Sequence, residues 1–219
     1  MMTIYNKFAR DIRPNLNRMR SGSSLNRSLA TLIVLTFLAA CSVATYTFNG
    51  SPYDPPRPAP DLELQRASGG AFDLEEFSGD IVLIYFGYTY CPDICPTTLA
   101  DVKLILEQLG DHADRVHMVM VTVDPDRDQP EVLRTYLDRF NPGFVGLWGQ
   151  GEELENILTS YGVFAQKEPS EDPDRYLVSH TARLFLIGPQ GSLRTNYTFG
   201  TPREEILADV EYLITEEMQ

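Results

Sequence analysis

The chain of 219 residues is 43% hydrophobic and 22% charged, a composition typical of one globular domain with appendages. Its formal net charge of −13 is uneven: residues 1–40 hold 6 of the 18 Lys and Arg residues and only 1 of the 31 acidic residues, which leaves −18 on the remainder. This balance argues against nucleic acid as a partner, since affinity for a phosphate backbone depends on Lys and Arg. Three cysteines are also too few for a disulfide framework or a four-thiolate zinc site.

Residues 1–40 are predicted to be a signal peptide or a membrane anchor. Basic residues precede an apolar run, Leu29–Ala40, which is shorter than the roughly 20 residues that span a bilayer. The run ends in Leu-Ala-Ala-Cys41, which resembles the bacterial lipobox, where cleavage exposes a cysteine that receives lipid. An uncleaved anchor is the alternative, because the apolar run continues to about Ala44. Both place the domain on the periplasmic face of a membrane, since the basic flank stays inside. A start at Met19 would give a leader of ordinary length.

Residues 41–60 are predicted to be the lipid-attachment cysteine and a tether. Residues 49–60 contain five of the 15 prolines in the chain, and proline-rich segments are extended and semi-rigid. We therefore expect the folded domain to occupy residues 61–219, without a second linker or an internal repeat.

The first half of this domain is predicted to form a β-α-β unit. Residues 81–86 are a continuous apolar run, typical of a central strand buried on both faces. A helix is expected over residues 92–109, with Gly110 just beyond its end. Residues 116–123 are a second apolar run and complete the unit.

The second half adds helices and a hairpin. The residues Asp128-Gln-Pro-Glu131 are typical of a capping box that opens a helix to about residue 140. Further elements are a helix over 152–161 closed by Gly162, a hairpin of 183–187 with 193–199, and a last helix from a cap at Thr201 to about Ile214. This order predicts an α/β fold, a thioredoxin-like three-layer sandwich with a central mixed sheet.

Two cysteines lie between the first predicted strand and its helix, in the stretch Tyr88-Thr-Tyr-Cys91-Pro-Asp-Ile-Cys95-Pro96. The spacing places both sulfurs on one face of a helical turn. The positive potential of a helix N-terminus favours thiolates, and two thiolates suit a soft metal, above all Cu(I). The same pair is within reach of a disulfide, since Cα atoms at this spacing are roughly 6 Å apart. Cys91 and Cys95 are therefore candidate metal ligands and a candidate redox pair.

A metal held by two thiolates needs a third ligand, and three histidines are available. His112 lies in a polar loop and is expected to be exposed, whereas His117 lies at a strand entrance and is expected to be structural. His180 precedes the predicted strand 183–187. In a thioredoxin-like topology the loop before that strand faces the start of the first helix, so His180 is the predicted third ligand.

The acidic loop Asp124-Pro-Asp-Arg-Asp128 begins like a calcium-binding EF-hand. Gln129 replaces the required glycine and Thr135 the closing acid, so we reject calcium. Asp128 is better explained as a helix cap. Asp124 lies at a strand end near the expected metal site and is a candidate supporting residue. Met118 and Met120 alternate along a buried strand and are expected in the core.

The residues Tyr85-Phe-Gly-Tyr-Thr-Tyr-Cys-Pro-Asp-Ile-Cys-Pro96, Val123-Asp-Pro-Asp-Arg-Asp128 and His180-Thr resemble the Sco/SenC family over about residues 60–217. The resemblance implies a thioredoxin-like domain, anchored at a membrane, that binds one copper through both motif cysteines and a histidine. It also implies a role in assembling the CuA centre of cytochrome c oxidase, and it assigns the ligand role to Cys91, Cys95 and His180. The family often has aspartate before the histidine, whereas this chain has Ser179, and it is usually anchored by an uncleaved helix.

These observations favour a membrane-tethered copper chaperone that binds one Cu(I) or Cu(II) per domain. Its expected partner is the CuA-bearing subunit of cytochrome c oxidase or another copper protein. A thiol-disulfide reductase is the first alternative, although such enzymes use two residues between their cysteines and here three intervene. A copper or redox sensor is the second. An oxidised Cys91–Cys95 pair could not bind Cu(I), so delivery of copper and thiol reduction are not exclusive.

Overall fold

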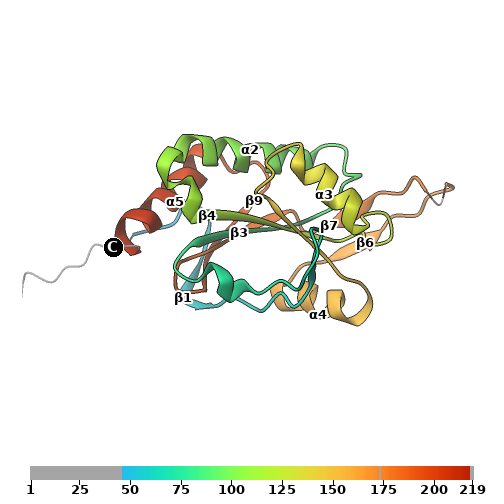
Figure 1. The fold of residues 1–219 in the computed structure, drawn as a ribbon, viewed down its shortest axis with the longest axis horizontal. Coiled ribbons are helices and arrows are strands. Elements are labelled where there is room, and N and C mark those ends of the chain that lie inside the picture. Colours follow the sequence, from blue (N-terminus) through green and yellow to red (C-terminus); the bar gives the residue numbers. More distant parts are fainter. Residues whose placement is uncertain (1–45, 173, 218–219) are drawn as a thin grey trace, which may run out of the picture. The chain divides into compact units, whose positions relative to one another are not determined.

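A mixed sheet of seven strands forms the centre of the part of the chain that the computed structural model describes, residues 46–172 and 174–217 (Figure 1). The strands are β1 (Ser51–Pro58), β2 (Gln65–Arg66), β3 (Ile81–Gly87), β4 (Val116–Thr122), β5 (Val145–Trp148), β8 (Arg183–Ile187) and β9 (Ser192–Thr198). They lie in the order β1-β9-β8-β3-β4-β5-β2. A separate two-stranded sheet pairs β6 (Ala165–Lys167) with β7 (Val178–His180). The leader expected over residues 1–40 and the expected lipid site, Cys41, lie outside the described residues.

Helices cover both faces of the central sheet, which gives the three layers expected from the sequence. Figure 1 shows α2 (Ile94–Leu109), α3 (Pro130–Asp138) and α5 (Arg203–Glu217) on one face and α4 (Gly151–Tyr161) on the other. Two short 3₁₀ helices, η1 (Leu74–Phe77) and η2 (Gly110–Arg115), precede β3 and β4. In this part of the chain, no helix combines the length and the apolar character needed to cross a bilayer.

Strand β3 lies at the centre of the sheet, and all seven of its residues are buried. It pairs with β4 in parallel and with β8 in antiparallel, so the sheet is mixed, as predicted. Phe86 packs against Tyr161 at the end of α4, whereas the Tyr85 hydroxyl lies against α2, where it contacts Cys95. Apolar side chains on both faces explain why the sequence of this strand is a continuous hydrophobic run and not an alternating one.

The structure differs from the sequence-based prediction over residues 51–58, which were expected in a tether. These residues form β1, which pairs with β9 at the edge of the sheet. Proline lacks a backbone N–H but is tolerated on an edge strand, where one side of the backbone pairs with no other strand. Asn49 secures the start of this segment, since its backbone and side-chain nitrogens donate to the buried Asp209 carboxylate, at distances down to 2.8 Å. The compact unit therefore begins at Thr47 and not at Asp61.

Two predicted helix caps are also wrong. The residue before α3 is Gln129, without a capping bond from its side chain, and the Asp128 carboxylate binds Thr89 and Thr122 instead. Helix α5 begins at Arg203 and not directly after Thr201, and the Thr201 hydroxyl donates to the Thr198 carbonyl outside this helix. In both cases a contact with another segment takes the side chain that the local pattern assigned to a cap.

Candidate metal centre

The two cysteines lie at the carboxyl end of β3, where the chain turns into α2. Cys91 is in the connecting loop and half-buried, whereas Cys95 is in the first turn of α2 and fully buried. The Cys95 backbone N–H donates to the Cys91 sulfur over 3.4 Å, so a donor at the helix N-terminus faces this sulfur, as expected from the spacing. Gly87, the last residue of β3, has no side chain, which lets the Tyr85 ring and the Cys95 sulfur lie close to the backbone of this strand. A Cβ at this position would lie 3.0 Å from the Cys95 sulfur and 2.6 Å from the Tyr85 ring.

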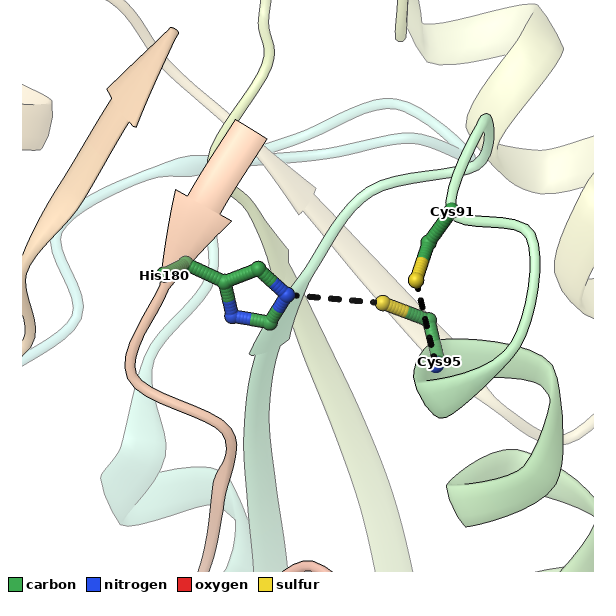
Figure 2. Close-up of side chains that lie close together, drawn as sticks. All are labelled: Cys91, Cys95 and His180. Carbon is green, nitrogen blue, oxygen red and sulfur yellow. Dashed lines mark hydrogen bonds between the residues drawn. The ribbon is translucent and has the colours of Figure 1, made fainter. Parts of the chain in front are cut away.

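His180 reaches the cysteines from a different segment, at the end of β7. Its Nε2 atom lies 3.7 Å from the Cys95 sulfur, and the ligand atoms of Cys91, Cys95 and His180 all lie within 4.8 Å of one another. Figure 2 shows the three side chains directed toward a common point. Across the described residues, these three form the one group of at least three Cys, His, Asp or Glu side chains spaced to hold a metal ion.

The imidazole is oriented by a backbone carbonyl and by two tyrosines. Its Nδ1 atom lies 3.3 Å from the Thr181 carbonyl oxygen, an acceptor that favours a proton on Nδ1 and leaves the Nε2 lone pair toward the sulfurs. The rings of Tyr85 and Tyr88 contact the imidazole edge-on, with centroids 6.2 and 5.8 Å away. Ser179 is exposed and donates to Glu168, so no carboxylate at position 179 supports the imidazole.

The two sulfurs differ in protonation. The hydrogen bond from the Cys95 thiol lowers the pKa of Cys91 to about 3, with a smaller effect from His180 in the same direction and an opposing effect from burial. The same hydrogen bond and burial together raise the pKa of Cys95. The Tyr85 hydroxyl also lies 3.6 Å from the Cys95 sulfur, and burial raises its pKa, so it remains a donor. The apo site therefore holds one accessible thiolate and one buried thiol.

The other candidate residues lie apart from this group. His112 is exposed, as predicted, and His117 binds the Asp80 carboxylate at 2.8 Å, which agrees with its expected structural role. Met118 and Met120 are buried in the core, as predicted.

Asp124 is fully buried but does not join the group of ligand atoms. Its carboxylate is shared by Arg127 and Tyr176, each at 2.6 Å.

A groove of about 450 Å³ opens beside the accessible sulfur. Cys91 and His180 line it together with Ile94 and the exposed side chains of Phe164 and Leu177. Sequence patterns did not identify Phe164, Leu177 or the tyrosines around the imidazole as part of the site. Tyr85 and Tyr88 could have been found from their position beside the cysteine motif, because a strand end that delivers ligands also delivers its neighbours.

Comparison with known proteins decides the family. The sequence profile of the SCO1/SenC family matches residues 52–215. The chain belongs to the SCO1/SenC family. An SCO2-like protein of Rickettsia felis is 38% identical over 146 residues, which cover 66% of this chain and 71% of that protein. The profile begins inside β1, in agreement with the place of this strand in the domain.

Solved structures of family members share the fold. The structure of Bradyrhizobium japonicum ScoI with copper bound is 34% identical and covers 72% of this chain and 99% of its own, with a TM-score of 0.65. The solution structure of apo Sco1 from Thermus thermophilus is 38% identical and covers 78% of this chain and 99% of its own, with a TM-score of 0.69. The thioredoxin-like α/β class predicted from the sequence is confirmed.

The difference between the two sulfurs predicts selective alkylation. In metal-free, reduced chain carrying Cys41→Ser, iodoacetamide should modify Cys91 well before the buried Cys95. The rate at Cys91 should stay nearly constant between about pH 5.5 and pH 8, because a pKa of about 3 leaves it a thiolate throughout this range. A free cysteine, with an ordinary pKa near 8.5, should instead react about tenfold faster per pH unit. Peptide mass spectrometry measures both rates. Modification of Cys95 first, or a steep rise of the Cys91 rate with pH, would contradict the assignment.

Proposed function

We propose that this chain binds one copper ion through Cys91, Cys95 and His180 and delivers it to the CuA centre of cytochrome c oxidase. The convergence of two sulfurs and one imidazole nitrogen within 4.8 Å is the observation that carries the proposal. Membership of the SCO1/SenC family and the similarity to a copper-bound ScoI support it.

The donor set fits copper in both oxidation states. Two thiolates suit Cu(I), and neutral imidazole suits both Cu(I) and Cu(II). The surrounding residues orient and shield these donors. The Thr181 carbonyl holds the imidazole with Nε2 toward the sulfurs. The interior of the domain shields Cys95 from solvent. Cys91 lies on the groove. A recipient protein would therefore reach the ion from the Cys91 side, which suits delivery of copper as a cargo.

Thiol-disulfide exchange is a second candidate function, and the unlike sulfurs favour it. An accessible thiolate can attack a disulfide, and a neighbouring thiol can then release the mixed disulfide. Cys91 and Cys95 meet these two descriptions. In that reaction the pair, one thiolate and one thiol, loses two electrons and one proton and becomes a disulfide, while a disulfide of the partner gains them and becomes a thiolate and a thiol. The oxidised pair would no longer offer thiolates to Cu(I).

The location proposed for the domain is the periplasmic face of a membrane, with Cys41 as the lipid-attachment residue. The basic segment, the apolar run and the Leu-Ala-Ala-Cys41 sequence support this proposal. Because the compact unit begins at Thr47, only a few residues would separate the lipid from the fold. Mass spectrometry of the mature N-terminus should find a diacylated cysteine at position 41. An intact leader in the membrane fraction would show that the chain is held by an uncleaved anchor.

Copper titration tests the ligand set. Competition with a Cu(I) chelator should give one tight site per chain, and Cys91→Ala or Cys95→Ala should weaken it by at least about 100-fold, since each removes one of two soft donors. His180→Ala should nearly eliminate Cu(II) binding and weaken Cu(I) binding by a smaller factor. Cys41→Ala is the matched control and should leave both affinities unchanged. Full affinity in a Cys91 or Cys95 variant would place the copper elsewhere.

Oxidase assembly in cells separates the two candidate functions. Under copper limitation, strains with Cys91→Ala and with His180→Ala should both lack cytochrome c oxidase activity, and added copper should restore part of it. A reductase needs both sulfurs, whereas an imidazole beside them contributes little to disulfide exchange. Full oxidase activity in the His180→Ala strain beside a defective Cys91→Ala strain would favour the reductase.

A further inference from the structure

The two parts of the candidate metal centre come from segments that lie outside the strands of the central sheet. Both cysteines belong to the loop and helix after β3, while His180 ends β7 in the two-stranded β6–β7 hairpin (Figure 2). In Figure 1 this hairpin, in orange, extends beyond the end of the central sheet. A two-stranded hairpin is marginally stable by itself. Pairing of β8 with β3 brings His180 near the cysteine segment, and contacts outside the central sheet then set the distance between the imidazole and the sulfurs.

One end of the acidic loop 124–128 holds the cysteine segment. The Asp128 carboxylate is fully buried and accepts three hydrogen bonds. Two come from the backbone N–H and the hydroxyl of Thr89, at 2.9 and 2.6 Å, and one comes from the Thr122 hydroxyl at 2.8 Å. Thr89 is two residues before Cys91, and Thr122 ends β4. Asp128 therefore fixes the start of the cysteine loop to the central sheet.

The residue next to Asp128 in this loop, Arg127, contacts the histidine hairpin. The guanidinium lies 3.5 Å from the ring centroid of Tyr176 and 4.6 Å from that of Tyr90. Tyr90 precedes Cys91, and Tyr176 lies just before β7, so one cation contacts an aromatic ring from each half of the site. The buried Asp124 carboxylate binds both Arg127 Nε and the Tyr176 hydroxyl, each at 2.6 Å. This arrangement keeps the guanidinium between the two rings.

A further pair of contacts supports the opposite strand of the hairpin. Lys167 in β6 pairs with Asp126 of the same acidic loop, and its ammonium group lies 4.8 Å from the Tyr176 ring centroid. The first residue of β6, Ala165, is the register partner of His180. The loop therefore contacts β6 and the segment just before β7.

We propose that Arg127 is a positioning residue which, held by Asp124, sets the distance between His180 and the Cys91–Cys95 pair. The proposal rests on the proposed copper site and deepens it: the acidic loop joins the two halves of the ligand set. The two cysteines lie four residues apart in one segment, so their sulfurs keep their spacing without Arg127. The distance between the imidazole and the sulfurs, in contrast, depends on Arg127. Loss of Arg127 should therefore lower the affinity for Cu(II), which depends on the imidazole nitrogen, more than the affinity for Cu(I).

The first experiment measures the hairpin without copper. Hydrogen exchange of the metal-free full chain should be at least about tenfold faster at the β6–β7 amides in Arg127→Ala than in the wild type, because local opening no longer has to break the guanidinium contacts. Amides of β3 and β4 should be unchanged. The matched control is Arg175→Ala, since Arg175 lies in the same hairpin and carries the same charge but is 87% exposed and pairs with Asp172 at the surface. Equal protection of the hairpin in both variants would overturn the proposal.

The second experiment measures copper. Arg127→Ala should lower the affinity for Cu(II) by about 10- to 100-fold, the range found when a residue that orients a ligand is removed, and the affinity for Cu(I) by less than about threefold. The nitrogen coupling in the electron paramagnetic resonance spectrum of bound Cu(II) should weaken. Arg127→Lys should resemble Arg127→Ala, because an ammonium group cannot lie flat between two rings while binding Asp124. Equal losses of Cu(I) and Cu(II) affinity would also contradict the proposal.

Two further outcomes remain decisive. If Arg127→Ala exchanges fast throughout the chain, Arg127→Lys replaces it, since this variant keeps the charge and the aliphatic stem and removes only the planar guanidinium. Faster exchange confined to the hairpin then supports the proposal, and unchanged exchange overturns it. If the wild-type chain binds no copper, the proposed function fails, whereas hydrogen exchange still decides whether Arg127 holds the hairpin.

Discussion

The approach of the His180 imidazole to the Cys95 sulfur depends on the direction of two neighbouring strands. Strand β8 runs antiparallel to β3, with Leu184 opposite Tyr85. The residues that precede β8 therefore lie beside the residues that follow β3. His180 comes shortly before β8, and Cys91 comes shortly after β3. The central sheet thus brings together two segments that are 85 residues apart in the sequence, and their side chains meet at 3.7 Å.

The two sulfurs differ in burial, so the site is closed to solvent on one side and open on the other. Cys95 is enclosed between Tyr85, α2 and the imidazole, whereas Cys91 lies on the groove with Phe164 and Leu177. An ion held between them would be shielded on one side and accessible on the other. The same asymmetry suits disulfide exchange, so copper delivery and thiol chemistry would use one face and exclude each other at any moment.

Local patterns in the sequence predict the parts of this site that local chemistry determines. The apolar run of β3 and the four-residue spacing of Cys91 and Cys95 are properties of short segments, and His180 followed from strand order.

The errors occur where a residue distant in the sequence determines the local structure or the side-chain contact. Residues 51–58 have the composition of a tether, yet pairing with β9 makes them a strand. Asp128 has the position of a helix cap, yet Thr89 and Thr122 take its carboxylate. Arg127 lies between rings of Tyr90 and Tyr176, which no local pattern connects.

X-ray absorption spectroscopy of the copper-loaded chain tests the central claim most directly, with Cys41→Ser included to remove the third thiol. The Cu(I) spectrum should fit two sulfur atoms and one imidazole nitrogen, and the imidazole scattering should disappear in His180→Ala while both sulfurs remain. A spectrum with sulfur alone in the unsubstituted site, or imidazole scattering that persists in His180→Ala, would contradict a copper site shared between the cysteine segment and the histidine hairpin.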